Sequence, residues 1–184
     1  MTHPELYVLR HGETEWNVEG RLQGALDSPL TATGRAQAHR QAALLAAAGV
    51  SAPIYSSPQG RAVQTAQIIG QKLGRDVVEA PALREVSMGT WDGALIADVA
   101  PADRADQVLW KFDAPGGTGL QAFRARILGF VATLTEPSIL VTHGVTSRVL
   151  RGALLQVQET QLANLPGGQG VVFHLKGGTQ NQLG

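Results

Sequence analysis

Two histidines, two arginines and a glutamate stand where short apolar runs of the sequence end. The run YVL ends on Arg10 and His11, and the run ILVT ends on His143; each histidine is followed by a glycine. Arg61 comes shortly after PIYSS, and Glu85 shortly after DVVEA. One guanidinium group can donate two parallel hydrogen bonds to the oxygens of a phosphate. An imidazole can act as a nucleophile or as an acid–base group near neutral pH. The set therefore indicates a phosphoryl group held between cationic side chains.

Metal binding and nucleotide binding are two other possible uses of these residues. His11 and His143 could be metal ligands, but a first-row metal usually takes a third histidine or carboxylate, and the neighbouring arginines would repel a cation. The sequence has no G-x-x-x-x-G-K-[ST] loop, and the glycines of PGGTG at 115–119 follow no strand in a G-x-G-x-x-G frame. We therefore predict neither a metal nor a bound cofactor.

The elements that must position these residues alternate between strands and helices. Crossover connections of this kind predict a mostly parallel sheet covered on both faces, so that side chains at the strand ends meet at one edge. We predict an α/β fold, a three-layer α/β/α sandwich, as one domain over residues 1–184. Expected strands are 5–10, 51–57, 76–80, 137–144 and 170–177, and expected helices run from Thr31 or Thr33 to Gly49, from near Pro58 to Gly74, around Ala102 to Phe112, and over 120–134 and 145–155; a polar tail follows.

The composition is that of an ordinary globular protein with 43% hydrophobic and 16% charged residues. Fifteen basic residues balance fifteen acidic ones, so no global field favours nucleic acid or an anionic membrane as a partner. The absence of cysteine excludes disulfides, thiolate zinc sites and a cysteine nucleophile. We expect no signal peptide and no membrane span, and therefore a cytoplasmic protein. The sequence is compatible with a homodimer.

Several motifs in collinear order resemble the histidine phosphatase (phosphoglycerate mutase-like) superfamily. The resemblance covers most of the chain and implies that His11 attacks phosphorus and becomes a phosphohistidine. It implies that Glu85 protonates the leaving alcohol and then activates water. Arg10, Arg61 and His143 would hold the phosphoryl oxygens, with Asn17, Gln23, Gly24 and Gly144 as further phosphate or substrate contacts. The motifs are LRHGET at 9–14, Asn17, GRLQG at 20–24, PLTxxGxxQA at 29–38, SSPxxRAxQTA at 56–66, LxExxxGxWDG at 83–93 and VTHG at 141–144.

The resemblance implies a metal-independent phosphomonoesterase of the histidine acid phosphatase type, acting on a small phosphorylated metabolite. One alternative is a 2,3-bisphosphoglycerate-dependent phosphoglycerate mutase, but the chain lacks the adjacent arginines and the extra segment of such mutases. Another is a non-catalytic phosphate-binding module, which would not require both a nucleophile and an acid. The family often shows P-x-G-E-S where this chain has Thr118-Gly119, which leaves the start of the following helix in question. Apolar residues between Leu95 and Phe112 either suit an apolar leaving group or belong to the core.

Overall fold

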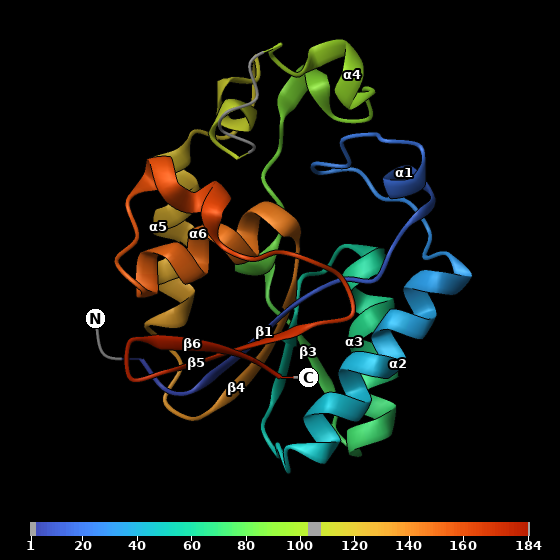
Figure 1. The fold of residues 1–184 in the computed structure, drawn as a ribbon, viewed down its shortest axis with the longest axis vertical. Coiled ribbons are helices and arrows are strands. Elements are labelled where there is room, and N and C mark those ends of the chain that lie inside the picture. The colour runs from blue at the N-terminus through green and yellow to red at the C-terminus, as the bar shows by residue number, and fades with distance from the viewer. Residues whose placement is uncertain (1–2, 103–107, 184) are drawn as a thin grey trace.

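A six-stranded sheet lies at the centre of the computed structural model, which describes residues 3–102 and 108–183 (Figure 1). The strand order is β3-β2-β4-β1-β5-β6. The first four strands in this order are parallel, whereas β5 runs antiparallel to β1 and β6 antiparallel to β5. The strands are β1 Leu6–Arg10, β2 Ile54–Ser56, β3 Val77–Glu79, β4 Ser138–Thr142, β5 Val172–Lys176 and β6 Thr179–Leu183.

Helices cover both faces of this sheet, which confirms the predicted α/β fold with a mostly parallel sheet. Helices α2 and α3 lie against one face, and α5 and α6 against the other (Figure 1). The α-helices are α1 Glu15–Val18, α2 Ala32–Ala47, α3 Gly60–Leu73, α4 Ile96–Val99, α5 Leu120–Val131 and α6 Gly144–Leu154. Short 3₁₀ helices span Pro81–Leu83, Gly89–Trp91, Leu109–Asp113 and Glu159–Asn164.

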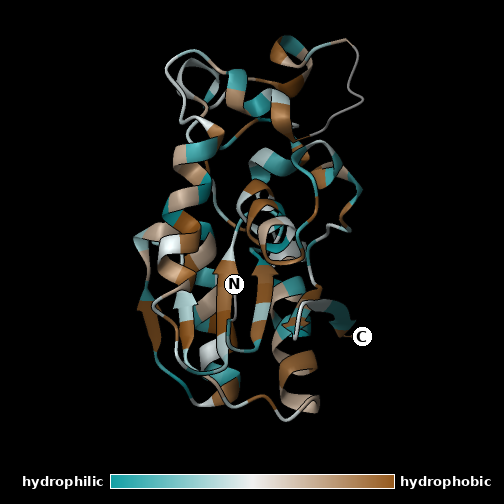
Figure 2. Cartoon of the chain, turned by 90° about the vertical axis from the view of Figure 1, so that its left-hand side faces the viewer, coloured by the Kyte–Doolittle hydropathy of each residue, from teal (hydrophilic) through white to brown (hydrophobic). Residues whose placement is uncertain are grey.

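The central strands are buried on both faces, because successive side chains of a strand point to opposite sides. On β1, Leu6 and Val8 pack in the same cluster as Phe123 of α5, whereas Leu9 packs with Leu45 of α2 and Ile69 of α3. Figure 2 shows this as a predominantly hydrophobic colouring of the central strands. The two apolar layers hold the sheet rigidly between the helices, and with it the residues at its edge.

The helix boundaries follow from the residues at their ends. Thr31 is the N-cap of α2 and accepts a hydrogen bond from the Gly34 amide at 3.0 Å. Helix α3 ends at Gly74, whose φ of 64° lies in the left-handed region that favours glycine. Helix α5 begins at Leu120 with Gly119 as its N-cap and no side-chain cap. The helix therefore forms there although the Glu-Ser pair of the family pattern is replaced by Thr118-Gly119.

Two sequence-based expectations differ from the structure. Of the helix expected around Ala102 to Phe112, residues 103–107 lie outside the described residues, and the described part contains the 3₁₀ helix Leu109–Asp113. The expected polar tail is instead strand β6, joined to β5 by Gly177 and Gly178, which have φ values of 57° and 76°. Positive φ at both positions suits a two-residue hairpin turn, so β6 forms an edge strand despite its polar sequence.

Candidate active site

Neighbouring parallel strands bring the two histidines together at the carboxyl edge of the sheet. Arg10 of β1 is in register with Thr142 of β4, so the next residue of each strand is a histidine. The His11 amide donates to the Thr142 carbonyl at 2.9 Å, and the two imidazole centroids are 5.2 Å apart. Strand β2, which pairs with β4 on its other side, brings Ser57 and the start of α3 to the same edge.

The hydrogen bonds of His11 define which of its ring nitrogens can react. Its Nδ1 lies 2.7 Å from the carbonyl oxygen of Gly12, which can only accept, so Nδ1 carries the proton. In the neutral ring Nε2 is then unprotonated, and its lone pair accepts a hydrogen bond from Arg61 Nε at 3.3 Å. The side chain is buried, with 2% exposure. The ring is thus fixed at one nitrogen and has a nucleophilic lone pair at the other.

Burial and nearby cations keep both histidines neutral. Burial in the protein, followed by the charges of Arg10 and Arg61, holds the pKa of His11 well below its ordinary value of 6.5. Burial is also the largest cause for His143, whose pKa is lowered well below 6.5 with further contributions from Arg61 and His11. A neutral imidazole keeps the lone pair that a nucleophile requires, so His11 is in its reactive form at neutral pH.

His143 is oriented by a serine of the neighbouring strand. Its Nε2 lies 2.7 Å from Ser57 Oγ, and that oxygen also accepts from the Gln59 amide at 3.3 Å. In the described part of the chain, His143 Nδ1 is buried without a partner. If Ser57 donates to Nε2, Nδ1 carries the proton, and a buried donor without a partner is then available to a ligand oxygen.

Arg61 is held in place by a loop that crosses above the start of α3. Its guanidinium group donates to the Leu26 carbonyl at 2.6 Å and to the Gly24 carbonyl at 3.2 Å. It also pairs with Asp27 at 2.9 Å, and its side chain is only 1% exposed. These contacts leave little rotamer freedom, so the Nε that faces His11 is preorganised for an anion.

Arg10 completes the cationic group around His11. Its Nε atom is buried without a partner among the described residues. Burial lowers its pKa and the charge of Glu85 opposes that effect, although an arginine stays protonated at neutral pH. The position of a Cβ on Gly144 would lie 3.6 Å from the Arg10 guanidinium carbon, so Gly144 packs directly against it. An unpaired buried donor on a cation indicates a place for an anion.

Glu85 lies across the cavity, bound to the first turn of α6. Its Oε2 accepts from the Val145 amide at 3.0 Å, and its Oε1 accepts from the Thr146 amide at 3.0 Å and the Thr146 hydroxyl at 2.8 Å. These donors fix the carboxylate, and Oε2 keeps the greater free capacity to accept or carry a proton. Glu85 is the only carboxyl group among the described residues that line the cavity.

The remaining predicted contacts lie on the loop opposite. Asn17, Gln23 and Gly24 all line the same cavity. Asn17 Oδ1 accepts from Thr14 and Gln169, so its amide NH₂ is the part left for a ligand. Gln23 is buried and donates to the Thr14 hydroxyl at 2.8 Å, while its Oε1 has no partner among the described residues. The observed contacts of Gly24 are made by its carbonyl, which binds Arg61 and Gln59.

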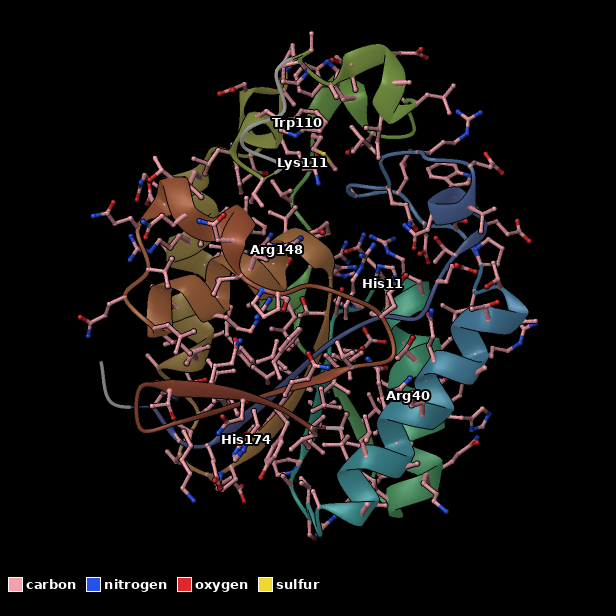
Figure 3. The ribbon with its side chains drawn as sticks, viewed as in Figure 1. His11, Arg40, Trp110, Lys111, Arg148 and His174 are labelled. Atoms are coloured by element: carbon pink, nitrogen blue, oxygen red, sulfur yellow. The ribbon has the colours of Figure 1, made fainter. Side chains whose placement is uncertain are left out.

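The cavity between these groups is small and strongly cationic, with a volume of about 120 Å³. Figure 3 shows a dense group of nitrogen atoms beside His11, whereas Arg40 and His174 lie toward the far end of the molecule. The cationic residues that line the cavity are Arg10, Arg21, Arg61, Lys111 and Arg148. His11 and His143 are buried next to this lining, since His11 contacts Arg61 and the two imidazole rings are neighbours. The predicted residues that line the cavity itself are Arg10, Asn17, Gln23, Gly24, Arg61, Glu85 and Gly144, and the structure adds three cations to them.

The family to which the sequence belongs can be decided by comparison with known proteins. The model of the histidine phosphatase superfamily (branch 1) matches residues 6–181. The chain belongs to this superfamily. The resemblance on which the sequence analysis depended is therefore confirmed for nearly the whole chain.

The relatives of the chain include proteins named as mutases and solved structures of which one is named as a phosphatase. A probable phosphoglycerate mutase GpmB of Proteus mirabilis is 44% identical over 62% of this chain, which is 51% of that protein's length. The same protein of Enterobacter sp. is 35% identical over 82% of this chain and 74% of its own. Among solved structures, mycobacterial glucosyl-3-phosphoglycerate phosphatase complexed with VO₃ has a TM-score of 0.81 and 32% identity over 94% of this chain and 91% of its own. TTHB049 of Thermus thermophilus has a TM-score of 0.76 and 35% identity, with 97% and 98% covered.

Several residues that position the site of this histidine phosphatase were not predicted from the sequence. Asp27 holds Arg61 through an ion pair, and Gln59 accepts a hydrogen bond from the backbone amide of Glu85. No sequence pattern marks either residue. Ser57 was visible only as part of a motif. Arg148 could have been found, because it lies about one turn into the helix that follows His143-Gly144, much as Arg61 lies in the first turn of α3.

Gly12 follows His11 at the end of β1, where its backbone is closely packed. In the structure the Gly12 amide donates to Thr65 Oγ1 at 3.1 Å. A Cβ at this position would lie 2.1 Å from the Gly34 carbonyl oxygen. Gly12 is therefore required for the close packing of the end of β1 against the first turn of α2.

Within residues 3–102 and 108–183, no three histidine, cysteine, aspartate or glutamate side chains are grouped so that they could hold a metal ion. No helix of the same part of the chain is long and apolar enough to cross a bilayer. The expectation of a metal-independent reaction stays a prediction.

Proposed function

We propose that this histidine phosphatase hydrolyses monophosphate esters of small metabolites through a phosphohistidine on His11, without a metal or cofactor. The observation that carries the proposal is the unprotonated Nε2 of His11, held beside Arg10 and Arg61 at the edge of a cavity that contains one carboxyl group. The proposal takes residues 1–184 as one catalytic domain. The cysteine-free composition is compatible with action in a reducing cytoplasm.

In the first step, His11 Nε2 attacks phosphorus in line with the ester oxygen. The N–P bond forms as the P–O ester bond breaks, and Glu85 gives its proton to the departing alkoxide. Arg10, Arg61 and His143 Nδ1 bind the three other phosphoryl oxygens and stabilise their charge in the transition state. Asn17 and Gly144 are proposed as further contacts at the edge of the phosphoryl site.

In the second step, water attacks phosphorus and transfers a proton to the Glu85 carboxylate. The N–P bond breaks, its electron pair returns to Nε2, and inorganic phosphate leaves. The net reaction consumes one ester and one water and yields one alcohol and one phosphate. The low pKa of His11 supports this step as well, because a neutral imidazole is regenerated without taking a proton from solvent.

The test is phosphate release from p-nitrophenyl phosphate between about pH 4 and 8, the range around the ordinary histidine pKa. We expect His11→Ala to lower kcat by at least about 10⁴-fold, because the covalent intermediate cannot form. His39→Ala, at an exposed position of α2, is the matched control and should retain activity. Acid quenching should trap a phosphoryl group on His11 of the wild type, and vanadate should inhibit competitively. A wild type that releases no phosphate would contradict the proposal.

A mutase is the second candidate, because relatives of the chain are named probable phosphoglycerate mutase GpmB. It would transfer the phosphoryl group from His11 to a second hydroxyl rather than to water. Interconversion of 2- and 3-phosphoglycerate that depends on added 2,3-bisphosphoglycerate, and that outpaces phosphate release, would favour the mutase over the phosphatase.

A further inference from the structure

The cavity contains more positive charge than one phosphoryl group requires. Arg10 and Arg61 flank His11 and are assigned to the phosphoryl oxygens. Arg21 is already neutralised, because it pairs with Glu19 at 2.6 Å and donates to the Gly93 carbonyl at 3.0 Å. Lys111 and Arg148 therefore remain, and we call these two residues the outer cations.

Neither outer cation has an acidic partner of its own in the described part of the chain. Arg148 makes one long hydrogen bond, from Nε to the Leu165 carbonyl at 3.4 Å. Lys111 Nζ lies 5.7 Å from the centroid of the Trp110 ring, and no described carboxylate is within ion-pair distance of it. Among the described residues, Glu85 is the one carboxylate that acts on both of these partly buried cations, and neither forms an ion pair with it. Two such cations lining one cavity indicate that a ligand supplies further negative charge.

The outer cations line the same cavity as Glu85. Arg148 comes from α6, whose first turn binds Glu85, and Lys111 comes from the 3₁₀ helix Leu109–Asp113 (Figure 3). Glu85 must be near the ester oxygen in order to protonate it. Groups that share the cavity with Glu85, but do not flank His11, are therefore placed to contact the alcohol part of the ester.

Given the proposed phosphatase function, we propose that Lys111 and Arg148 form a second anion site, which selects phosphate esters whose leaving alcohol carries a carboxylate. The charge count favours a single negative charge there. Among the described residues, five cations line the cavity against three carboxylates, those of Glu85 and of the partners Glu19 and Asp27. When Glu85 is protonated to act as acid, the excess is three, of which a phosphoryl dianion takes two.

The size and lining of the cavity agree with a small polar substrate. Its volume of about 120 Å³ is well below the roughly 300–1,000 Å³ of pockets that hold drug-sized ligands. The apolar residues between Leu95 and Phe112, which could have served an apolar leaving group, pack mainly in the core. Val108 and Trp110 are buried there, and Ile96 alone of this group lines the cavity.

Lys111 adds a pH signature that distinguishes this site from a purely structural role. Burial is the largest cause that lowers the pKa of Lys111 to about 8. Glu85 opposes this shift, whereas Arg10 and Arg148 add to it, and Arg21 lines the same cavity. The selectivity for a carboxylate should therefore be full below pH 8 and fall as the pH rises above it, because Lys111 loses its charge.

The experiment compares kcat/KM for 3-phosphoglycerate and glycerol 3-phosphate, which differ in a carboxylate against a hydroxymethyl group. Both carry the same phosphate, so its ionisation cancels in the ratio. We expect a preference of about tenfold or more for the carboxylate at pH 7, the scale of one hydrogen bond to a charged group. Lys111→Met should abolish most of this preference, because kcat/KM should fall more for 3-phosphoglycerate than for glycerol 3-phosphate. Lys111→Arg should keep it above pH 8, because guanidinium does not lose its proton there.

Lys72→Met, at an exposed position in the last turn of α3, is the matched control for loss of one lysine charge. Its preference should equal that of the wild type. Equal kcat/KM for the two esters in a wild type that hydrolyses both would overturn the second anion site but leave the phosphatase intact. A stronger preference for glycerol 1,3-bisphosphate than for 3-phosphoglycerate would overturn the carboxylate assignment. No hydrolysis of any ester, p-nitrophenyl phosphate included, would overturn the proposed function itself.

Discussion

The two ends of the cavity are built in different ways. The phosphate cluster, which we define as Arg10, His11, Arg61 and His143, stands at strand ends and in the first turn of α3. His11, Arg61 and His143 are at most 2% exposed. Of the outer cations, Lys111 stands in a 3₁₀ helix within the irregular part of the chain, and both it and Arg148 are only partly buried.

This difference separates chemistry from selectivity. A sheet buried between two apolar layers holds its edge residues in one geometry, which transition-state stabilisation requires. Connecting segments on such a scaffold vary more freely, and binding residues are often found on them. The phosphate cluster should therefore account for the reaction, and Lys111 for the choice of ester. Changes in the cluster should affect every substrate alike, whereas changes at Lys111 should affect only carboxylated ones.

Glu85 links the two ends, and its substitution should have the largest effect of the three changes considered below. We expect Glu85→Gln to lower kcat for glycerol 3-phosphate by about 10²–10⁴-fold, the usual contribution of a general acid. The effect on the first step should be much smaller for p-nitrophenyl phosphate, because nitrophenolate leaves without a proton. Burst kinetics of nitrophenol release measure that step separately from hydrolysis of the phosphohistidine.

A structural role for Glu85 would give a different result. Its carboxylate binds the first turn of α6, so its loss could displace His143 instead. In that case formation of the phosphohistidine would slow equally for the nitrophenyl ester and the alkyl ester. Equal losses for the two esters would reject Glu85 as the general acid. They would show instead that Glu85 supports the geometry of the phosphate cluster.

Ser57 tests whether the phosphate cluster depends on its supporting residues. Ser57→Ala removes the hydroxyl 2.7 Å from His143 Nε2, so the ring is free to carry its proton on that nitrogen instead. We expect kcat to fall about tenfold for every ester, the scale of one hydrogen bond, with little change in KM. The acidic limb of the kcat profile should also shift, because the environment of His143 has changed.

Ser138→Ala is the matched control for Ser57→Ala. Ser138 is a fully buried serine as well, and it donates to the Glu136 carbonyl at 2.9 Å from the opposite end of β4. Loss of this hydrogen bond should lower stability without lowering kcat. An unchanged kcat in Ser57→Ala would mean that packing alone orients His143.

The same contrast explains how far the sequence could predict the site. Arg10, His11 and His143 were found because buried parallel strands have recognisable apolar runs, and the residues after them meet at one edge. Lys111 was not selected, because an exposed cation on a helix and one that lines a cavity look alike in sequence. Arg148 was not selected either, although its place after His143-Gly144 resembles that of Arg61 in α3. Only the fold brings Lys111 and Arg148 together, through α6 and a segment without regular periodicity.

The elements follow the same rule. Helices with caps and apolar faces, such as α2 with Thr31 and α3 with Gly74, were predicted close to their ends. Strand β6 was missed, because this mostly polar edge strand has no alternation of polar and apolar residues to reveal it. Its signal was the Gly177-Gly178 pair, a common two-residue hairpin turn.

The smallest expected effect is on stability, and it concerns the histidines of the phosphate cluster in the absence of substrate. Their pKa values are lowered in the folded protein, so between the folded and unfolded pKa values the unfolded chain binds more protons. Stability should therefore be full above about pH 6.5 and fall below it, by up to about 1.4 kcal/mol per pH unit for each histidine. Urea unfolding at pH 5, 6 and 7 measures this slope.

The contribution of one histidine is isolated by His11→Asn, which keeps a polar group of similar size but cannot titrate. Other groups titrate in the same range, so the informative quantity is the difference in slope between variant and wild type. His39→Asn should leave the slope unchanged, because His39 is exposed on α2. Equal slopes for His11→Asn and the wild type would show that His11 does not resist protonation in the folded state. The neutral nucleophile, on which the assignment of chemistry to the strand ends depends, would then have to be created by substrate binding.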